Sequence, residues 1–247
     1  MKLGVNIDHI ATLRNARGQD NPNLIRALKV CQEAKIDTLT VHLREDRRHI
    51  KDKDLFELKK YSKIPINLEM ALTEEMIKIA SKTNPKFICI VPEKRNEITT
   101  EGGLNLNKIS QAKLKKLLKI SGKKNIQLSA FINPTKKMIN LAKNLGFDTV
   151  ELHTGNLDKK IIRKSTINQI NEMIDYAHSK KLIVNVGHGL NFKNIKFIKK
   201  RKYVDTVHVG HFIISEAIFI SLTKTINIFR NLILNTIFVF QDIINED

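Results

Sequence analysis

Histidines are concentrated at the ends of apolar segments in this sequence, where they could carry out acid–base chemistry. The chain has 8 histidines, and only His178 falls on a helical pattern. The others lie at or just past the ends of expected strands, namely His9, His42, His49, His153, His188, His208 and His211. Because imidazole titrates near neutral pH, this clustering favours general acid–base catalysis. For His153 and His208, a structural role as satisfied core residues stays an alternative.

The segment 41–50 ends an expected strand with charged residues. Val41 and Leu43 alternate with His42 and Arg44. This period of two is typical of a strand with one apolar face and one polar face. The charged residues that directly follow Arg44 have no chemistry assigned to them. We expect them to form a salt-bridged loop that fixes the flanking side chains.

The same alternation gives several other expected strands a polar face. In a parallel barrel the outward face packs on helices and takes aliphatic residues, so the polar face points inward. Burying many polar groups is costly unless they bind one another, water or a ligand. They include Asn6, Asp8, Glu69, Glu151, His153, Asn185 and His208. Barrel active sites form at the C-terminal ends of strands, and burial raises carboxylate pKa values. We therefore expect His42, Glu69 and His188 to surround one substrate as acids and bases.

Strand and helix patterns alternate along the chain. We expect strands at 3–8, 38–43, 65–70, 86–91, 126–131, 148–153, 182–187 and 204–209, with amphipathic helices between them. This rhythm predicts one α/β domain over residues 1–247, a TIM (β/α)8 barrel with extra short helices. A doubly wound open sheet is the alternative, which is disfavoured because no G-x-G-x-x-G motif follows the first strand. After about residue 231 an apolar tail is expected either to extend the last helix onto a partner subunit or to be loosely constrained.

Local signals mark helix starts and two long loops. Helix starts are expected at Asn21-Pro22, Thr73 and Pro134-Thr135. The segments 92–106 and 154–166 are longer than usual for βα loops and contain glycine. Such loops in this fold are usually lids or binding loops.

The composition argues against several classes of protein. Lys and Arg number 43 against 25 for Asp and Glu, which gives a net charge of +18. The lysines are scattered over helical patterns without interleaved aromatic residues, so we expect no nucleic-acid binding. We find no signal peptide and no apolar run long enough to span a membrane. Cys31 and Cys89 are expected to be reduced core residues of a cytoplasmic protein.

Glycine-containing turns and basic residues suit anionic groups. Gly189 and Gly210 follow the seventh and eighth expected strands, and glycine lets backbone N–H groups approach a phosphate closely. Arg17 and Arg44 would also suit anions. A metal site is a rival chemistry, but no tight H-x-H or H-E-x-x-H spacing occurs, and no strand end carries an inward lysine for a Schiff base. We therefore expect no metal.

Several ordered motifs resemble a known family. They are VNIDHIATLRNARG (5–18), TVHLREDRRHI (40–50), NLEMA (67–71), VPEKR (91–95), TTEGG (99–103), ELHTG (151–155), NVGHGL (185–190) and VGH (209–211). Together they resemble the pyridoxine 5′-phosphate synthases of the deoxyxylulose-dependent vitamin B6 pathway, from about residue 3 to about 220. The resemblance implies a condensation, free of cofactor and metal, of 1-deoxy-D-xylulose 5-phosphate with 3-amino-2-oxopropyl phosphate to pyridoxine 5′-phosphate, phosphate and water. It also implies that the 92–106 loop is a lid and that the protein is a homo-octamer.

The resemblance further implies roles for individual residues. His42 and Glu69 match the family's general bases, and His188 matches its general acid. Glu151 matches the carboxylate that stabilises a transition state. The residues that match the amino-ketone phosphate site are Asn6, Arg17, Gly189, Gly210 and His211. Those that match the deoxyxylulose phosphate site are Asp8, His9, Arg44, His49 and Thr99.

Two other functions stay open from the residues alone. The first is another sugar-phosphate lyase or isomerase on a barrel, which would turn over one substrate without the amine. The second is a basic nucleic-acid-binding protein, which would bind with a steep dependence on salt.

Overall fold

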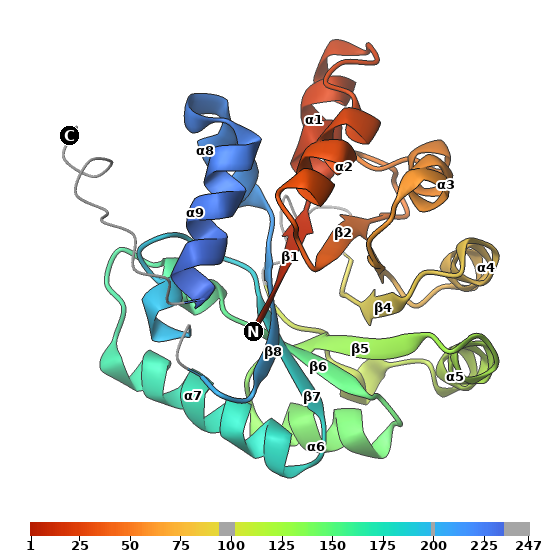
Figure 1. Cartoon of the computed structure of the whole chain (residues 1–247). Helices are drawn as coiled ribbons and strands as arrows, with labels where there is room; N and C mark the ends of the chain where they lie inside the picture. The colour runs from red at the N-terminus through yellow and green to blue at the C-terminus, as the bar shows by residue number, and fades with distance from the viewer. Residues whose placement is uncertain (94–101, 199–200, 235–247) are drawn as a thin grey trace.

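Eight parallel strands close into a barrel in the computed structural model, which describes residues 1–93, 102–198 and 201–234 (Figure 1). Each strand pairs with the next in sequence, and β8 pairs with β1. The strands are β1 (Lys2–Asn6), β2 (Thr38–His42), β3 (Ile66–Met70), β4 (Phe87–Ile90), β5 (Gln127–Ile132), β6 (Thr149–His153), β7 (Ile183–Gly187) and β8 (Val204–Val209). Each lies within two residues of its predicted range, and the TIM barrel prediction is confirmed.

Helices surround this barrel. They are α1 (Asp8–Arg17), α2 (Leu24–Glu33), α3 (Asp52–Tyr61), α4 (Glu74–Thr83), α5 (Gln111–Lys124), α6 (Lys136–Asn144), α7 (Lys164–Ser179), α8 (His211–Ile220) and α9 (Leu222–Leu234). Short 3-10 turns are η1 (Leu106–Lys108), η2 (Gly155–Asp158) and η3 (Ile195–Phe197). The extra helices α1 and α8 follow β1 and β8 directly. Both therefore begin at the C-terminal mouth of the barrel.

Helix starts follow from capping side chains. Thr73 accepts a hydrogen bond from the Met76 N–H, and Thr135 accepts one from Met138, as predicted. The prediction of a start at Asn21-Pro22 was wrong by two residues. The Asn23 side chain caps α2 instead, because its oxygen accepts an N–H of the first turn that no backbone carbonyl can reach.

The first strand is shorter than predicted. It ends at Asn6, and Asp8 begins α1 instead of continuing the strand. The alternation of apolar and polar residues does not distinguish a longer strand from a helix start at this point, because Ile7 and Asp8 are both buried. Asp8 therefore reaches the mouth of the barrel from a helix N-terminus, where a carboxylate is favoured by the helix dipole.

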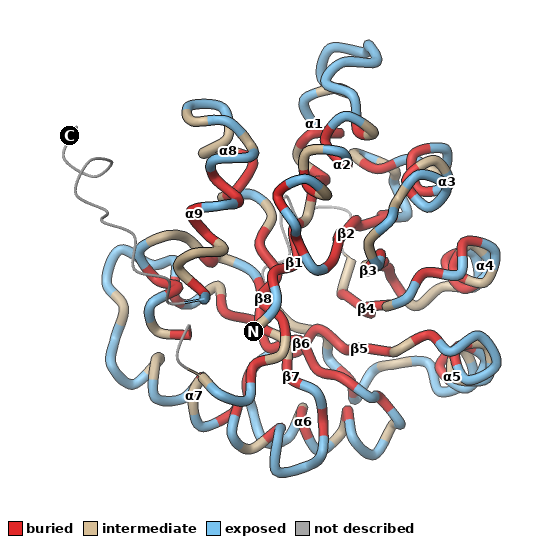
Figure 2. The backbone as a smooth tube through the Cα atoms, viewed as in Figure 1, coloured by how far each residue is buried: buried red, intermediate tan, exposed pale blue. Residues whose placement is uncertain are grey.

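Aliphatic residues of the strands pack outward against the helices, and the barrel strands are buried almost throughout (Figure 2). The interior is polar, as the alternation predicts. Thr40 lies 2.9 Å from Nδ1 of His208, and Asn67 donates to Thr40 at 3.4 Å. His208 is thus satisfied in the core, which is the structural role that the sequence left open.

The apolar segment near the C-terminus begins as an ordered helix. α9 runs to Leu234 and packs its Ile226, Phe229 and Ile233 into the core. Residues 235–247 lie outside the described residues, so the extent of the domain to residue 247 stays a prediction. Within the described part, no helix is long and apolar enough to cross a membrane. Cys31 and Cys89 are buried and free.

Adding a methyl group at two different glycines should change the stability of the protein in opposite directions. A Cβ at Gly4 would lie 2.3 Å from Nδ1 of the buried His208, whereas a Cβ at Gly122, on the exposed face of α5, would meet nothing within 4 Å. We expect Gly4→Ala to lower the free energy of unfolding by about 1–3 kcal/mol through overpacking. We expect Gly122→Ala to raise it by about 0.5–1 kcal/mol through helix propensity. Urea unfolding measures both; equal effects of the two variants would contradict the packing argument.

Candidate active site

Strand register brings the two expected bases together at the C-terminal mouth of the barrel. His42 and Glu69 are Cα partners across β2 and β3. Nδ1 of His42 lies 3.9 Å from Oε2 of Glu69. Neighbouring residues in register point to the same face of a sheet, so both side chains enter the barrel. The predicted pairing of these residues is therefore a direct consequence of barrel closure.

A second carboxyl group, Glu151 of β6, lies deeper in the barrel. Its Oε2 is 3.9 Å from both Sγ of Cys89 and Nε2 of His208. Burial raises the pKa of Glu151. Burial, with the negative charges of Glu151 and Asp8, also raises the pKa of Glu69 well above its ordinary value. The mouth therefore contains two carboxyl groups that can hold protons near neutral pH and exchange them with a substrate.

Asp8 and Asn6 connect the β1 side of the mouth to His42. Oδ1 of Asp8 accepts the backbone N–H of His42 at 2.9 Å, and Oδ2 accepts from Nδ2 of Asn6 at 2.8 Å. Burial raises the pKa of Asp8 to about 6, although the His42 charge opposes this. Gly210 lies against Asn6, since a Cβ there would be 3.1 Å from the Asn6 Cβ. The β8–α8 turn therefore adjoins the same site.

His188 enters the site from the β7 turn in an unfavourable backbone conformation. Its φ is 74°, and that of Gly189 is 70°. A left-handed conformation costs a non-glycine residue about 1–2 kcal/mol. Thr154 offsets this by donating from its hydroxyl to the carbonyl oxygens of Gly187 and His188, at 2.8 and 2.7 Å. Burial lowers the pKa of His188, so its imidazolium is a better proton donor than an exposed one.

The remaining histidines gather on the β1–β2 side, with one exception. The His9 and His211 rings are 5.0 Å apart, and the His42 and His49 rings are 5.7 Å apart. Burial lowers the pKa of His9 to about 4 and that of His49 to about 3. His153, on β6, instead packs 5.0 Å from His188. Burial also lowers the pKa of His153 to about 4, so the imidazoles of His9, His49 and His153 are neutral at physiological pH.

The extra helix α1 holds the His49 loop in place. Arg14 donates from both terminal nitrogens to Asp54 of α3, at 2.6 and 2.8 Å. Asn15 donates to the backbone oxygen of His49 at 2.8 Å. The helix that begins with Asp8 in the site is thus anchored at its other end to the loop that carries His49.

The charged loop after Arg44 is salt-bridged, as predicted. Asp46 pairs with Arg44 at 3.3 Å and Arg48 at 2.7 Å. Arg47 pairs with Asp52 at 2.7 Å and also with Glu75. Burial raises the pKa of Asp46, but its hydrogen bonds with the two arginines have the larger, opposite effect, so the net shift is downward. The loop is therefore held by ionised pairs that fix the position of Arg44.

Two predicted binding residues are not placed with the others. Arg17 is exposed at the far end of α1. It lies nine positions after Asp8, which is roughly 14 Å along the helix at about 1.5 Å per residue. Thr99, with residues 94–101 of the expected lid, lies outside the described residues.

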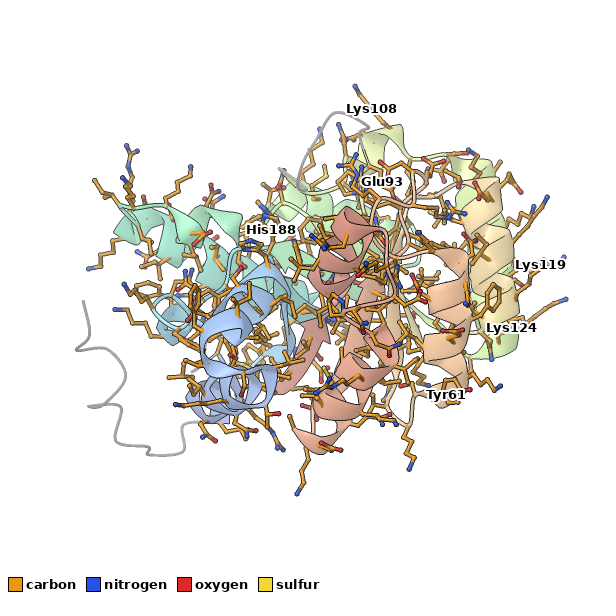
Figure 3. All side chains as sticks on the ribbon, turned by 90° about the horizontal axis from the view of Figure 1, so that it is seen from above. Tyr61, Glu93, Lys108, Lys119, Lys124 and His188 are labelled. Carbon is orange, nitrogen blue, oxygen red and sulfur yellow. The ribbon has the colours of Figure 1, made fainter. Side chains whose placement is uncertain are left out.

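Two site residues were missed by the sequence reasoning. Glu93, just after β4, lies 2.8 Å from Nε2 of His42. Thr154 supports His188. Both lie in motifs that carried the family resemblance, VPEKR and ELHTG, which was a signal that they could belong to the site. Figure 3 shows Glu93 and His188 near the middle of the molecule, whereas Lys119 and Lys124 of α5 extend outward.

One group of described residues has the composition of a metal site. Single ligand atoms of Asp8, His42 and His49 lie within 4.8 Å of one another. However, several of their polar atoms already have protein partners. Both Asp8 oxygens accept hydrogen bonds, Nε2 of His42 contacts Glu93, and Nδ1 of His49 accepts from the Ile50 N–H. A metal ion would compete with these hydrogen bonds at those four atoms.

The closed barrel and the buried acid–base groups at its C-terminal mouth define a TIM-barrel enzyme. A family model described as "Pyridoxal phosphate biosynthesis protein PdxJ" matches residues 3–235. The chain belongs to this family.

Curated relatives agree with this assignment. The pyridoxine 5′-phosphate synthase of Pelagibacter ubique (strain HTCC1062) is 44% identical over 235 residues, which cover 94% of this chain and 98% of that protein. The pyridoxine 5′-phosphate synthase of Ehrlichia canis (strain Jake) is 43% identical over 237 residues, 95% of this chain and 98% of the relative. Among solved structures, 3-hexulose-6-phosphate synthase from Salmonella typhimurium matches with a TM-score of 0.69 at 14% identity, covering 95% and 99% of the two chains. At that identity the likeness concerns the fold alone.

The raised pKa of Glu151 predicts a pH-dependent stability effect of its replacement. Burial raises this pKa from 4.5 to about 8. The folded state then binds a proton that the unfolded state has lost, so this group's contribution to stability falls as pH rises from 4.5 to 8, by up to about 1.4 kcal/mol per unit. We expect Glu151→Gln to gain stability relative to the wild type across this window and to differ least near pH 4.5. Thermal unfolding at a series of pH values measures this; a constant difference would contradict it.

Proposed function

We propose that this chain is a pyridoxine 5′-phosphate synthase that joins 1-deoxy-D-xylulose 5-phosphate and 3-amino-2-oxopropyl phosphate. The products are pyridoxine 5′-phosphate, phosphate and water. The observation that carries the proposal is the set of buried acid–base groups at one barrel mouth, with His42 3.9 Å from Glu69, in a chain that belongs to the PdxJ family.

The reaction requires several proton transfers in one pocket. An amine condenses with a ketone and loses water, and protons leave carbon as the ring closes. We assign His42 and Glu69 as general bases, His188 as general acid and Glu151 as the group that stabilises a transition state. The raised pKa values of the two carboxyl groups support proton exchange with the substrate, because efficient proton transfer needs pKa values near the working pH.

Two phosphorylated substrates require two anion sites. We assign the amino-ketone phosphate to Asn6, Arg17, Gly189, Gly210 and His211. We assign the deoxyxylulose phosphate to Asp8, His9, Arg44, His49 and Thr99. The N-terminus of α8, which begins at His211 directly after Gly210, supports the first site because backbone N–H groups there favour an anion. The position of Arg44 beside the His42 strand end supports the second.

The assembly and location are also proposals. We propose a single-domain chain in a cytoplasmic homo-octamer that needs no metal, cofactor or nucleic acid. Ile218 and Phe219 of α8 are 66% and 82% exposed. Large apolar side chains at such exposure support burial against another subunit.

Replacement of the assigned bases tests the function. We expect His42→Asn and Glu69→Gln each to lower the rate of pyridoxine 5′-phosphate formation about 100- to 10,000-fold, because each removes a general base. The assay supplies both substrates and measures product and released phosphate. The control is His178→Asn, since His178 lies on α7 and stacks on Tyr203. Wild-type rates in both base variants, or turnover of one substrate without the amine, would overturn the proposal.

Chelation tests whether the reaction depends on metal. We expect prolonged dialysis against a chelator to leave the rate of product formation unchanged, since both oxygens of Asp8, Nε2 of His42 and Nδ1 of His49 have protein partners. Metal content is measured before and after dialysis. A loss of activity that divalent zinc or magnesium restores would contradict the metal-free proposal.

A further inference from the structure

The imidazole of His42 lies between two carboxyl groups of different character. Nε2 is 2.8 Å from Oε1 of Glu93, which is hydrogen-bonding distance. Nδ1 is 3.9 Å from Oε2 of Glu69, which is too long for a hydrogen bond. One ring nitrogen is therefore engaged by the protein, and the other faces the reaction pocket.

Glu93 is built into the wall of the site. Its side chain is only 6% exposed. Its second oxygen, Oε2, accepts the backbone N–H of Glu45 at 3.0 Å. Both carboxylate oxygens thus have fixed donors. One donor is the side chain of His42, the last residue of β2, and the other is the backbone N–H of Glu45. This geometry allows little rotation of the carboxylate.

The two carboxyl groups also differ in charge. Burial raises the pKa of Glu93, but the hydrogen bond from His42, the positive charges of His42 and Arg44, and the Glu45 N–H lower it more, so the net shift is downward. The pKa of Glu69 is raised. Glu93 is therefore the ionised partner, and an ionised carboxylate can only accept hydrogen bonds. The proton of a neutral His42 must then be on Nε2.

We propose that Glu93 is a positioning residue that fixes His42 in the Nε2–H tautomer, which leaves Nδ1 as the basic nitrogen that faces Glu69 and the substrate. This inference rests on the proposed role of His42 as a general base. A carboxylate that orients an imidazole in this way also stabilises the imidazolium that forms when the base accepts a proton.

Other titratable groups also surround His42. Asp8 approaches from α1, Glu69 from β3, His49 from the loop before α3, and Arg44 from the end of β2, in addition to Glu93. Of these groups, only Glu93 is within hydrogen-bonding distance of a ring nitrogen of His42 in the described part of the chain. Changes at Glu93 should therefore alter the tautomer directly.

Replacement of Glu93 by glutamine gives an unusually specific test. The amide has one oxygen, but two donors, the Glu45 N–H and the His42 Nε2–H, require an acceptor. If the oxygen takes the fixed backbone N–H, the NH2 group faces Nε2 of His42. This arrangement selects the opposite tautomer, with the proton on Nδ1, and so removes the basic nitrogen from the pocket.

The experiment measures the tautomer and the kinetics separately. Solid-state ¹⁵N NMR of protein labelled at histidine, at a pH where His42 is neutral, reports which ring nitrogen carries the proton; the His42 signals are assigned by their loss in His42→Asn. We expect Nε2–H in the wild type and Nδ1–H in Glu93→Gln. We expect kcat for product formation to fall about 100-fold or more in Glu93→Gln. In Glu93→Ala, the acid limb of the kcat/KM profile should move to lower pH by about one unit. The reason is that the protonated form of His42 loses the negative charge that stabilises it.

The control is Glu45→Gln, which removes a carboxylate from the adjacent exposed residue while retaining the backbone N–H. It should leave the tautomer, kcat and the pH profile unchanged, and circular dichroism should show that every variant is folded. A wild-type Nδ1–H tautomer, or an unchanged tautomer in Glu93→Gln, would overturn the inference. The failure of the proposed function would be distinct, since it would appear as a wild-type protein that forms no pyridoxine 5′-phosphate, whatever its tautomer.

Discussion

Closure of eight parallel strands is the constraint on which the site depends. Once the barrel closes, every second side chain of each strand must point inward, and neighbours in register share that interior. His42 and Glu69 become neighbours because β2 and β3 pair with His42 opposite Glu69. Glu151 enters from the other side through β6. Groups that are more than a hundred residues apart along the chain thus share one mouth without any need for a dedicated loop.

Exclusion of water by this barrel then sets the protonation states. Burial raises the pKa values of Asp8, Glu69 and Glu151 and lowers those of His49 and His188. The carboxyl groups of Glu69 and Glu151 therefore hold protons at higher pH than in water, and the imidazoles of His49 and His188 lose theirs at lower pH. Glu93 is the exception, because its hydrogen bonds to His42 and to the backbone outweigh the cost of burial. Glu93 is therefore ionised beside His42, whereas Glu69 on the other side of the ring has a raised pKa.

Loops contribute orientation that the strands do not supply. Thr154 offsets the left-handed conformation of His188 through two carbonyl contacts. Asn15 and Arg14 tie α1 to the loop of His49 and to α3. The ion pairs of Asp46 and Arg47 hold the segment that carries Arg44. These contacts are polar and local, so each could be tuned without disturbing the aliphatic core of the barrel.

The sequence by itself determined the barrel, its strand ranges and the inward polar face, because these follow from a period of two and from helix caps such as Thr73, which act over a few residues. The motifs identified the family and predicted which residues carry the acid–base chemistry. Only the tertiary structure decided that Asp8 begins a helix, that Arg17 lies far along α1, and that Glu93 contacts His42. Those outcomes depend on how the strands stagger and where loops return, and contacts between residues distant in sequence leave no periodic pattern within either segment.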